Sequence, residues 1–108
     1  WKKLTGKKMV YALWVATKDF AARSPEGLRR AAALIEESFA YGIAHKDEAI
    51  RSVLDEKPFL YHELDEYLGG VIRWDLADDY LDGLRTYYAL AEQNGLIEKA
   101  PAIEFADV

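Results

Sequence analysis

Apolar residues follow two patterns along the chain, one continuous and one periodic. The continuous run occupies residues 9–17, is rich in β-branched and aromatic residues, and contains no glycine or proline. Such a run is typical of a strand buried on both faces. A core helix is the alternative on periodicity alone. Gly6 and the polar residues before the run, and a helix-start signal after it, favour the strand.

That start signal is Ser24-Pro25-Glu26. Serine is a good N-cap, proline suits the first helical position, and an acidic residue is favoured in the first turn. The spacing predicts one long helix that runs to about His45. Its apolar stripe, with steps of three and four residues, is Leu28, Ala32, Ile35, Phe39 and Ile43.

The later part of the chain predicts further helices. A short one opens at Asp47-Glu48 and ends before Pro58, and another covers residues 62–68 until Gly69-Gly70 stops it. Residues 71–74 form a brief extended segment. The last helix is predicted to be capped by Asp75 and closed by Asn94-Gly95, with Ala77, Leu81, Leu84, Tyr88 and Ala91 facing inward.

A strand at residues 9–17 needs neighbours, because its amides and carbonyls require ladder partners. The chain offers only residues 71–74 and 103–105, and both are short. Either the run is a core helix, or its partner strands lie on chain that is missing here, which we favour. The organisation we expect is a crossing segment and buried strand at 1–17, a helical part at 18–98 and a tail at 99–108.

Composition narrows the classes of function. The 108 residues contain no cysteine, which excludes disulfides, thiolate nucleophiles and cysteine–zinc sites. A net charge of −5 disfavours nucleic acid as a partner. The longest apolar stretch falls far short of the ~20 residues that a membrane helix needs. The opening residues have no secretory pattern, and because they begin with Trp1 we expect the true start to lie upstream.

Three motifs could carry chemistry, and each has a simpler explanation. Gly6-Lys7-Lys8 lacks the earlier glycine, the Ser or Thr and the following helix of a phosphate-binding loop. His62-Glu63 begins like a zinc-protease helix, but the second histidine position is Glu66. Residues 78–82 match the DDxxD spacing that holds Mg²⁺ in isoprenoid diphosphate synthases, yet acidic residues are favoured in a first helical turn anyway.

The order of segments resembles a known family more than any single motif does. Trp1 and Thr5-Gly6 come first, then residues 9–14, and then Lys-Asp-Phe-Ala at 18–21. Residues 66–68, 84–88, 91–92 and 95–97 continue the pattern. Over roughly residues 1 to 98 this ordered set resembles the C-terminal part of chorismate dehydratase, of the futalosine route to menaquinone. Lys7-Lys8 departs from the family, which usually has Leu-Pro or similar there.

This resemblance implies an α/β chain, the C-terminal portion of a two-lobed fold like type II periplasmic binding proteins, mostly helical with one buried crossing strand. It implies a cytoplasmic lyase that removes water from chorismate and leaves 3-[(1-carboxyvinyl)oxy]benzoate. The reaction needs no redox cofactor and no metal, and neither nucleic acid nor a membrane takes part. Most substrate-binding residues would lie upstream, so no catalytic residue is assigned. Thr5, Gly6 and Tyr11 are expected near the cleft, at the lobe crossing.

Two other classes of function remain open at this stage. A solute-binding module of the same architecture would lack catalysis, and fold alone does not separate it from the enzyme. A self-contained helical interaction domain would have residues 9–17 as a core helix. If the chain is part of the lyase, the 108 residues alone, without the rest of the cleft, should be inactive.

Overall fold

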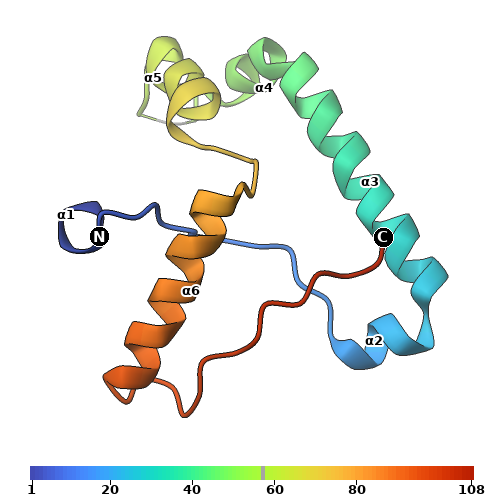
Figure 1. Cartoon of the computed structure of the whole chain (residues 1–108). Helices are drawn as coiled ribbons and strands as arrows, with labels where there is room; N and C mark the ends of the chain where they lie inside the picture. The colour runs from blue at the N-terminus through green and yellow to red at the C-terminus, as the bar shows by residue number, and fades with distance from the viewer. Residues whose placement is uncertain (57) are drawn as a thin grey trace. The chain divides into compact units, whose positions relative to one another are not determined.

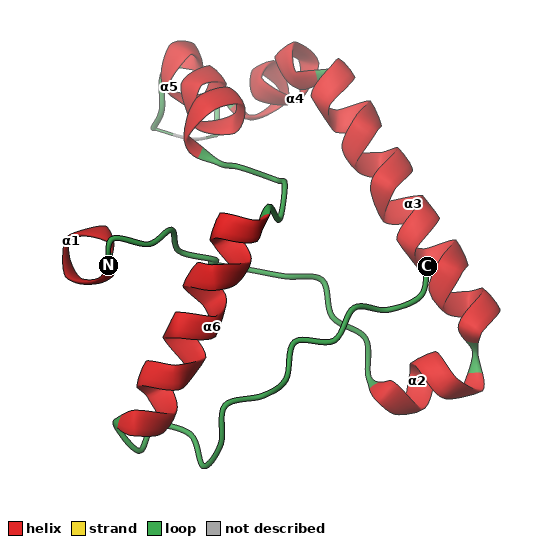
Figure 2. Cartoon of the chain, in the orientation of Figure 1, coloured by secondary structure: helices red, strands yellow, loops and turns green. Residues whose placement is uncertain are grey.

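In the computed structural model, which describes residues 1–56 and 58–108, every regular element is helical (Figure 2). In chain order the elements are α1 (Lys2–Thr5), α2 (Lys18–Arg23), α3 (Pro25–Ala44), α4 (Lys46–Val53), α5 (Tyr61–Glu66), the π-helical turn η1 (Tyr67–Val71) and α6 (Asp78–Gln93). They belong to two compact units. One is Trp1–Thr17 with Asp75–Asp107, and the other is Lys18–Trp74 with Val108.

The expected α/β fold with a buried crossing strand is wrong for this chain. The described residues contain no strand, and residues 9–17 follow an irregular path that is neither strand nor helix. Tyr11 is 90% exposed, Trp14 83% and Val15 86%. A strand exists only through ladder hydrogen bonds to a neighbour, and the described part of the chain supplies no neighbour to this run. The alternative of a core helix at residues 9–17 is wrong as well.

The first unit is built around α6, and the segment that follows α1 passes across it (Figure 1). The helix begins later than predicted, since its N-cap is Ala77 and no side chain caps it, so the predicted cap by Asp75 is wrong. Its buried face confirms most of the predicted stripe, while Ala77 is exposed and Tyr88 is partly buried. The buried residues of α6 are Leu81, Gly83, Leu84 and Ala91.

The end of α6 is as predicted. Gly95 has a φ of 69°, a left-handed conformation that glycine adopts without steric cost. The amide of Leu96 donates to the carbonyl of Ala91 at 2.9 Å, and the amide of Gly95 donates to that of Glu92 at 2.9 Å. These two bonds are the Schellman motif, which satisfies the last free carbonyls of a helix.

The second unit contains the long helix α3. Its start at Pro25 and its end beside His45 confirm the predicted bounds. The hydroxyl of Ser24 makes no capping hydrogen bond, so that part of the prediction is wrong. No residue of α3 is fully buried, and even Phe39 and Ile43 of the predicted stripe are 40% and 49% exposed. The ring of Phe39 lies 5.2 Å from that of Trp74, measured between centroids.

Helices α4 and α5 of the second unit pack on each other. Ile50, predicted to face inward, is only 1% exposed and is the most buried side chain of this unit. At the start of α5 the amide of Leu60 donates to Glu63 Oε2 at 2.7 Å, which satisfies a free first-turn donor. The predicted stop at Gly69-Gly70 is a π-helical turn, after which Ile72 is extended.

No helix among the described residues is both long enough and apolar enough to cross a bilayer.

Candidate functional site

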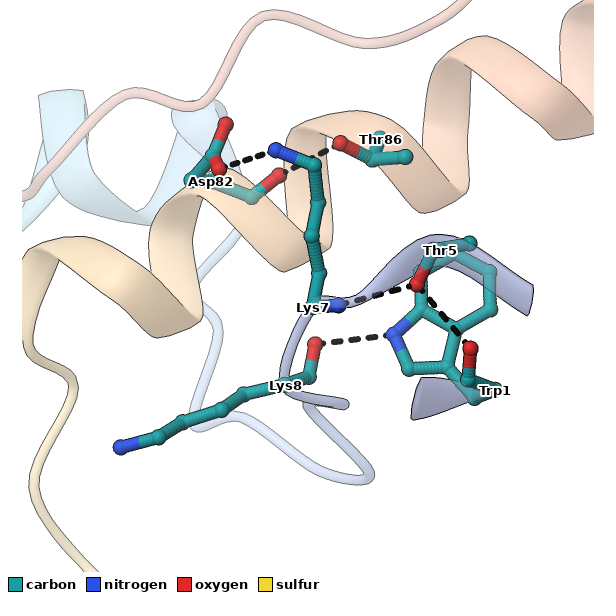
Figure 3. Close-up of polar contacts among 6 residues, drawn as sticks. All are labelled: Trp1, Thr5, Lys7, Lys8, Asp82 and Thr86. Carbon is teal, nitrogen blue, oxygen red and sulfur yellow. Dashed lines mark hydrogen bonds and ion pairs between the residues drawn. The ribbon is translucent and has the colours of Figure 1, made fainter. Parts of the chain in front are cut away.

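The N-terminal segment and α6 are joined by a cluster of polar contacts (Figure 3). The indole Nε1 of Trp1 donates to the carbonyl oxygen of Lys8 at 2.9 Å. The same carbonyl lies against Gly83, where an added Cβ would come within 2.0 Å of it. Glycine at position 83 therefore lets the segment touch the backbone of α6. The ring of Trp1 also meets the ring of Tyr87, which lies on α6, edge to face, with centroids 5.9 Å apart.

Thr5 and Gly6, two of the expected cleft residues, lie in this cluster. The hydroxyl of Thr5 donates to the carbonyl of Trp1 at 3.1 Å and accepts from the amide of Lys7 at 3.2 Å. Both bonds are local, so this hydroxyl closes the turn after α1. Gly6 has a φ of 71° and ends α1 in the left-handed conformation. Nothing lies within 4 Å of where its Cβ would be, so its backbone borders open space.

Tyr11, the third expected residue, lies outside this cluster. Its side chain is 90% exposed and belongs to the irregular segment at residues 9–17. The structure thus brings Thr5 and Gly6 together at one turn and leaves Tyr11 on the surface further along the same segment.

Two lysines hold the acidic first turns of α6. Lys7 Nζ forms an ion pair with Asp82, and Lys8 Nζ forms one with Asp79 at 2.7 Å. The Lys8 ammonium also lies 4.4 Å from the centroid of the Tyr80 ring, a cation–π contact. The hydrogen bond from Lys8 lowers the pKa of Asp79 below its usual 3.8, because it stabilises the carboxylate form.

These pairs explain the DDxxD sequence. Asp79 and Asp82 face lysines from the N-terminal segment, and lysine is a competitor for the carboxylate oxygens that a Mg²⁺ ion would need. Across residues 1–56 and 58–108 no group of three or more His, Asp or Glu side chains is placed to hold a metal ion. The two ion pairs also give a structural role to Lys7 and Lys8, the residues that depart from the family pattern.

A second polar centre joins α4 and α5, and sequence analysis did not find it. The Tyr61 hydroxyl donates to Asp47 Oδ1 at 2.6 Å, and Arg51 Nε donates to Asp47 Oδ2 at 2.9 Å. Hydrogen bonds from Arg51, first, and from Tyr61 lower the pKa of Asp47, and the bond to Asp47 raises the pKa of Tyr61. The four-residue spacing of Asp47 and Arg51 on one helix could have predicted their ion pair. Tyr61 lies on the next helix, and no spacing rule predicts its contact with Asp47.

Another ion pair joins α4 to α5. Lys46 Nζ lies 2.7 Å from Asp65 Oδ1, and a Cβ at Gly69 would come within 2.9 Å of the same ammonium. His62 and Glu63 lie on α5, where the carboxylate of Glu63 accepts from the backbone of Leu60. This contact gives Glu63 a structural role at the start of α5.

These contacts belong to a helical protein. Within the described residues, its polar clusters join neighbouring segments through ion pairs and hydrogen bonds. A comparison with protein-family models places the chain more narrowly: residues 1–93 match the family described as menaquinone biosynthesis. The chain belongs to this family and has a role in menaquinone biosynthesis, which confirms the resemblance seen in the order of its segments. Comparisons with curated proteins and with solved structures gave no match.

Proposed function

We propose that this chain is part of a lyase that removes water from chorismate and leaves 3-[(1-carboxyvinyl)oxy]benzoate. The observation that carries the proposal is the family match over residues 1–93, joined to the ordered set of segments that resembles chorismate dehydratase. In this elimination one C–O bond breaks, a proton leaves the neighbouring ring carbon, and the ring becomes aromatic. The protein has to orient a dicarboxylate and assist the proton transfer.

The lysines of the N-terminal segment do not serve as free carboxylate receptors in this proposal. Lys7 and Lys8 are engaged with Asp82 and Asp79, so binding of a dicarboxylate there has to displace an ion pair. Exposed pairs of this kind contribute little, so displacing one costs little, but the carboxylates on α6 repel an anionic ligand. We therefore propose that the charges that bind chorismate lie on chain beyond these residues, and that the 108-residue chain alone is inactive.

Tyr11 is the residue of this chain that we propose for substrate contact. Its phenol is 90% exposed and can donate a hydrogen bond to a carboxylate. Thr5 and Gly6 are proposed to support it by fixing the turn from which the exposed segment leaves, since the hydroxyl of Thr5 is already used twice.

The test is a chorismate assay on the full natural protein that carries these residues, with product followed by chromatography. We expect turnover by the full protein and none by the purified 108-residue chain. Turnover by the short chain contradicts the proposal that the binding charges lie elsewhere. Binding of chorismate by the full protein without turnover contradicts the lyase.

A pair of matched variants tests the role of Tyr11. In the full protein we expect Tyr11→Phe to raise KM for chorismate several-fold and to leave the thermal midpoint unchanged, because the side chain is exposed. Tyr67→Phe, which also removes a hydroxyl from a tyrosine that is 49% exposed, is the control and should change neither value. Equal KM values for the wild type and Tyr11→Phe would remove Tyr11 from the site.

A further inference from the structure

A shallow groove runs along one face of α3. It has a volume of about 500 Å³, and all of its lining residues come from this helix. They are Gly27, Arg30, Ala31, Ala33, Leu34 and Glu37. Leu34, in the middle of this set, is 64% exposed. No residue of α3 is fully buried, and Leu34 is exposed at the centre of this face.

The groove carries a positive charge on one side of Leu34 and a negative charge on the other. Arg30 precedes Leu34 by four residues and Glu37 follows it by three. At 1.5 Å per residue they lie about 6 Å and about 4.5 Å from Leu34 along the axis, on its two sides. One end of the groove is therefore positive and the other end negative, with a leucine between them.

Such a surface is complementary to itself only when two copies run in opposite directions. We propose that this groove of α3 binds the same groove of a second copy of the chain, antiparallel, about a two-fold axis beside Leu34. Arg30 then lies within about 1.5 Å, along the axis, of Glu37 of the second copy, and symmetry repeats the pair. A parallel arrangement instead places Arg30 beside Arg30 and Glu37 beside Glu37.

A small residue beside Leu34 favours close packing of the two helices. Ala31, beside Leu34 on the same face, permits the close helix approach of 8–10 Å that helix packing requires.

The neighbouring charges of α3 are used differently. Arg29, which does not line the groove, pairs with Glu26 of the same helix at 3.2 Å. Within the described residues, Arg30 and Glu37 make no such pair with each other or with another side chain. The two charges that border the groove are thus the ones left for a second copy.

One helix face is a small interface. A stable protein–protein contact usually buries about 800 Å² on each partner, and a 20-residue helix about 30 Å long offers less than this from one side. We therefore expect weak, concentration-dependent association, with charge setting the orientation and partner choice more than the affinity.

Sedimentation velocity on the full chain over a wide concentration range tests the dimer. Arg30→Glu places two acidic residues opposite two acidic residues, and Glu37→Arg places basic opposite basic, so each should raise the dissociation constant about tenfold or more. The double variant Arg30→Glu/Glu37→Arg restores opposite charges and should return to the wild-type value. Equimolar Arg30→Glu and Glu37→Arg should associate with each other at wild-type strength.

The matched controls are Arg29→Glu and Glu36→Arg, which make the same charge changes at residues of α3 that do not line the groove and should leave the dissociation constant within about twofold. Circular dichroism of each variant establishes that the helix content is retained. A wild-type chain that stays monomeric throughout the range overturns the proposal. Controls that weaken the dimer as much as Arg30→Glu does, or a mixture that fails to associate, overturn it equally.

Discussion

The carbonyl oxygen of Lys8 lies against the backbone of Gly83, so that a Cβ at position 83 would come within 2.0 Å of it. The indole Nε1 of Trp1 donates to the same oxygen at 2.9 Å. The N-terminal segment is therefore held on α6 by a contact that depends on the lack of a side chain, with two surface ion pairs beside it. This contact, more than the charges, fixes the segment from which the exposed residues 9–17 leave.

Replacement of Gly83 by alanine should push the N-terminal segment off α6. Real Cβ atoms do not come so close to an oxygen, and forcing extra volume into a packed site costs about 1–3 kcal/mol, more than the ~1 kcal/mol that alanine gains in a helix. Chemical denaturation should show a lowered midpoint. Gly42→Ala, in α3 where nothing lies within 4 Å, is the control and should raise it. Two variants that move the midpoint the same way would contradict the close contact.

The Lys8–Asp79 pair should be visible in an acid titration. Asp79 has a lowered pKa in the folded chain, so its pairing stabilises the fold above the unfolded value near 3.8 and is lost as the pH falls through the still lower folded value. NMR titration of the Asp79 carboxyl should give a pKa below 3.8, and Lys8→Met should raise this pKa toward 3.8. Lys7→Met, which removes the neighbouring pair to Asp82, should leave it low. An unchanged pKa in Lys8→Met would mean that the pair does not form in solution.

The Asp47–Tyr61 hydrogen bond should couple the titrations of these two residues. Asp47 holds the pKa of Tyr61 above 10.0, so its share of stability is present below pH 10 and is lost as the pH rises through the folded value. In Asp47→Asn the pKa of Tyr61, read by NMR on ring-labelled tyrosine, should fall toward 10.0. In Tyr61→Phe the pKa of Asp47 should rise only in part, since Arg51 makes the larger contribution. If the asparagine variant leaves Tyr61 unchanged, α4 and α5 are not joined in this way.

The two helix starts should respond differently to alanine. The Ser24 hydroxyl makes no cap bond in α3, so Ser24→Ala should change the free energy of unfolding by less than about 0.5 kcal/mol. The carboxylate of Glu63 accepts from the amide of Leu60 at the start of α5, so Glu63→Ala should cost about 1 kcal/mol. Denaturant midpoints at neutral pH compare them. A loss of about 1 kcal/mol in Ser24→Ala would mean that Ser24 does cap α3, as the sequence predicted.

Helix ends and inward faces could be predicted where the cause is local. Pro25 at the first position of α3, and Gly95 in the left-handed conformation after α6, follow from the steric properties of those residue types. The burial of Ile50 and Leu84 follows from their spacing on a helix. These features need only the residues within a turn or two, and the structure confirms them.

The candidate site was less accessible from the sequence. Thr5 and Gly6 were singled out together and do lie at one turn, but their roles there are local. The partners of Lys7 and Lys8 are about 75 positions away on α6, and no spacing rule reaches that far. The sequence gives no sign that Gly83 is needed, because its role depends on the carbonyl of Lys8 that lies against it.

The sequence by itself determined the bounds of α3, how α6 ends, and, through the order of its segments, the family to which the chain belongs. Only the tertiary structure decided what becomes of residues 9–17 and of the acidic turns of α6. An apolar run becomes a strand only when another strand supplies its hydrogen bonds, and a carboxylate is a metal ligand or an ion-pair partner according to what lies beside it. Both outcomes depend on groups far away in the sequence, which local pattern does not encode.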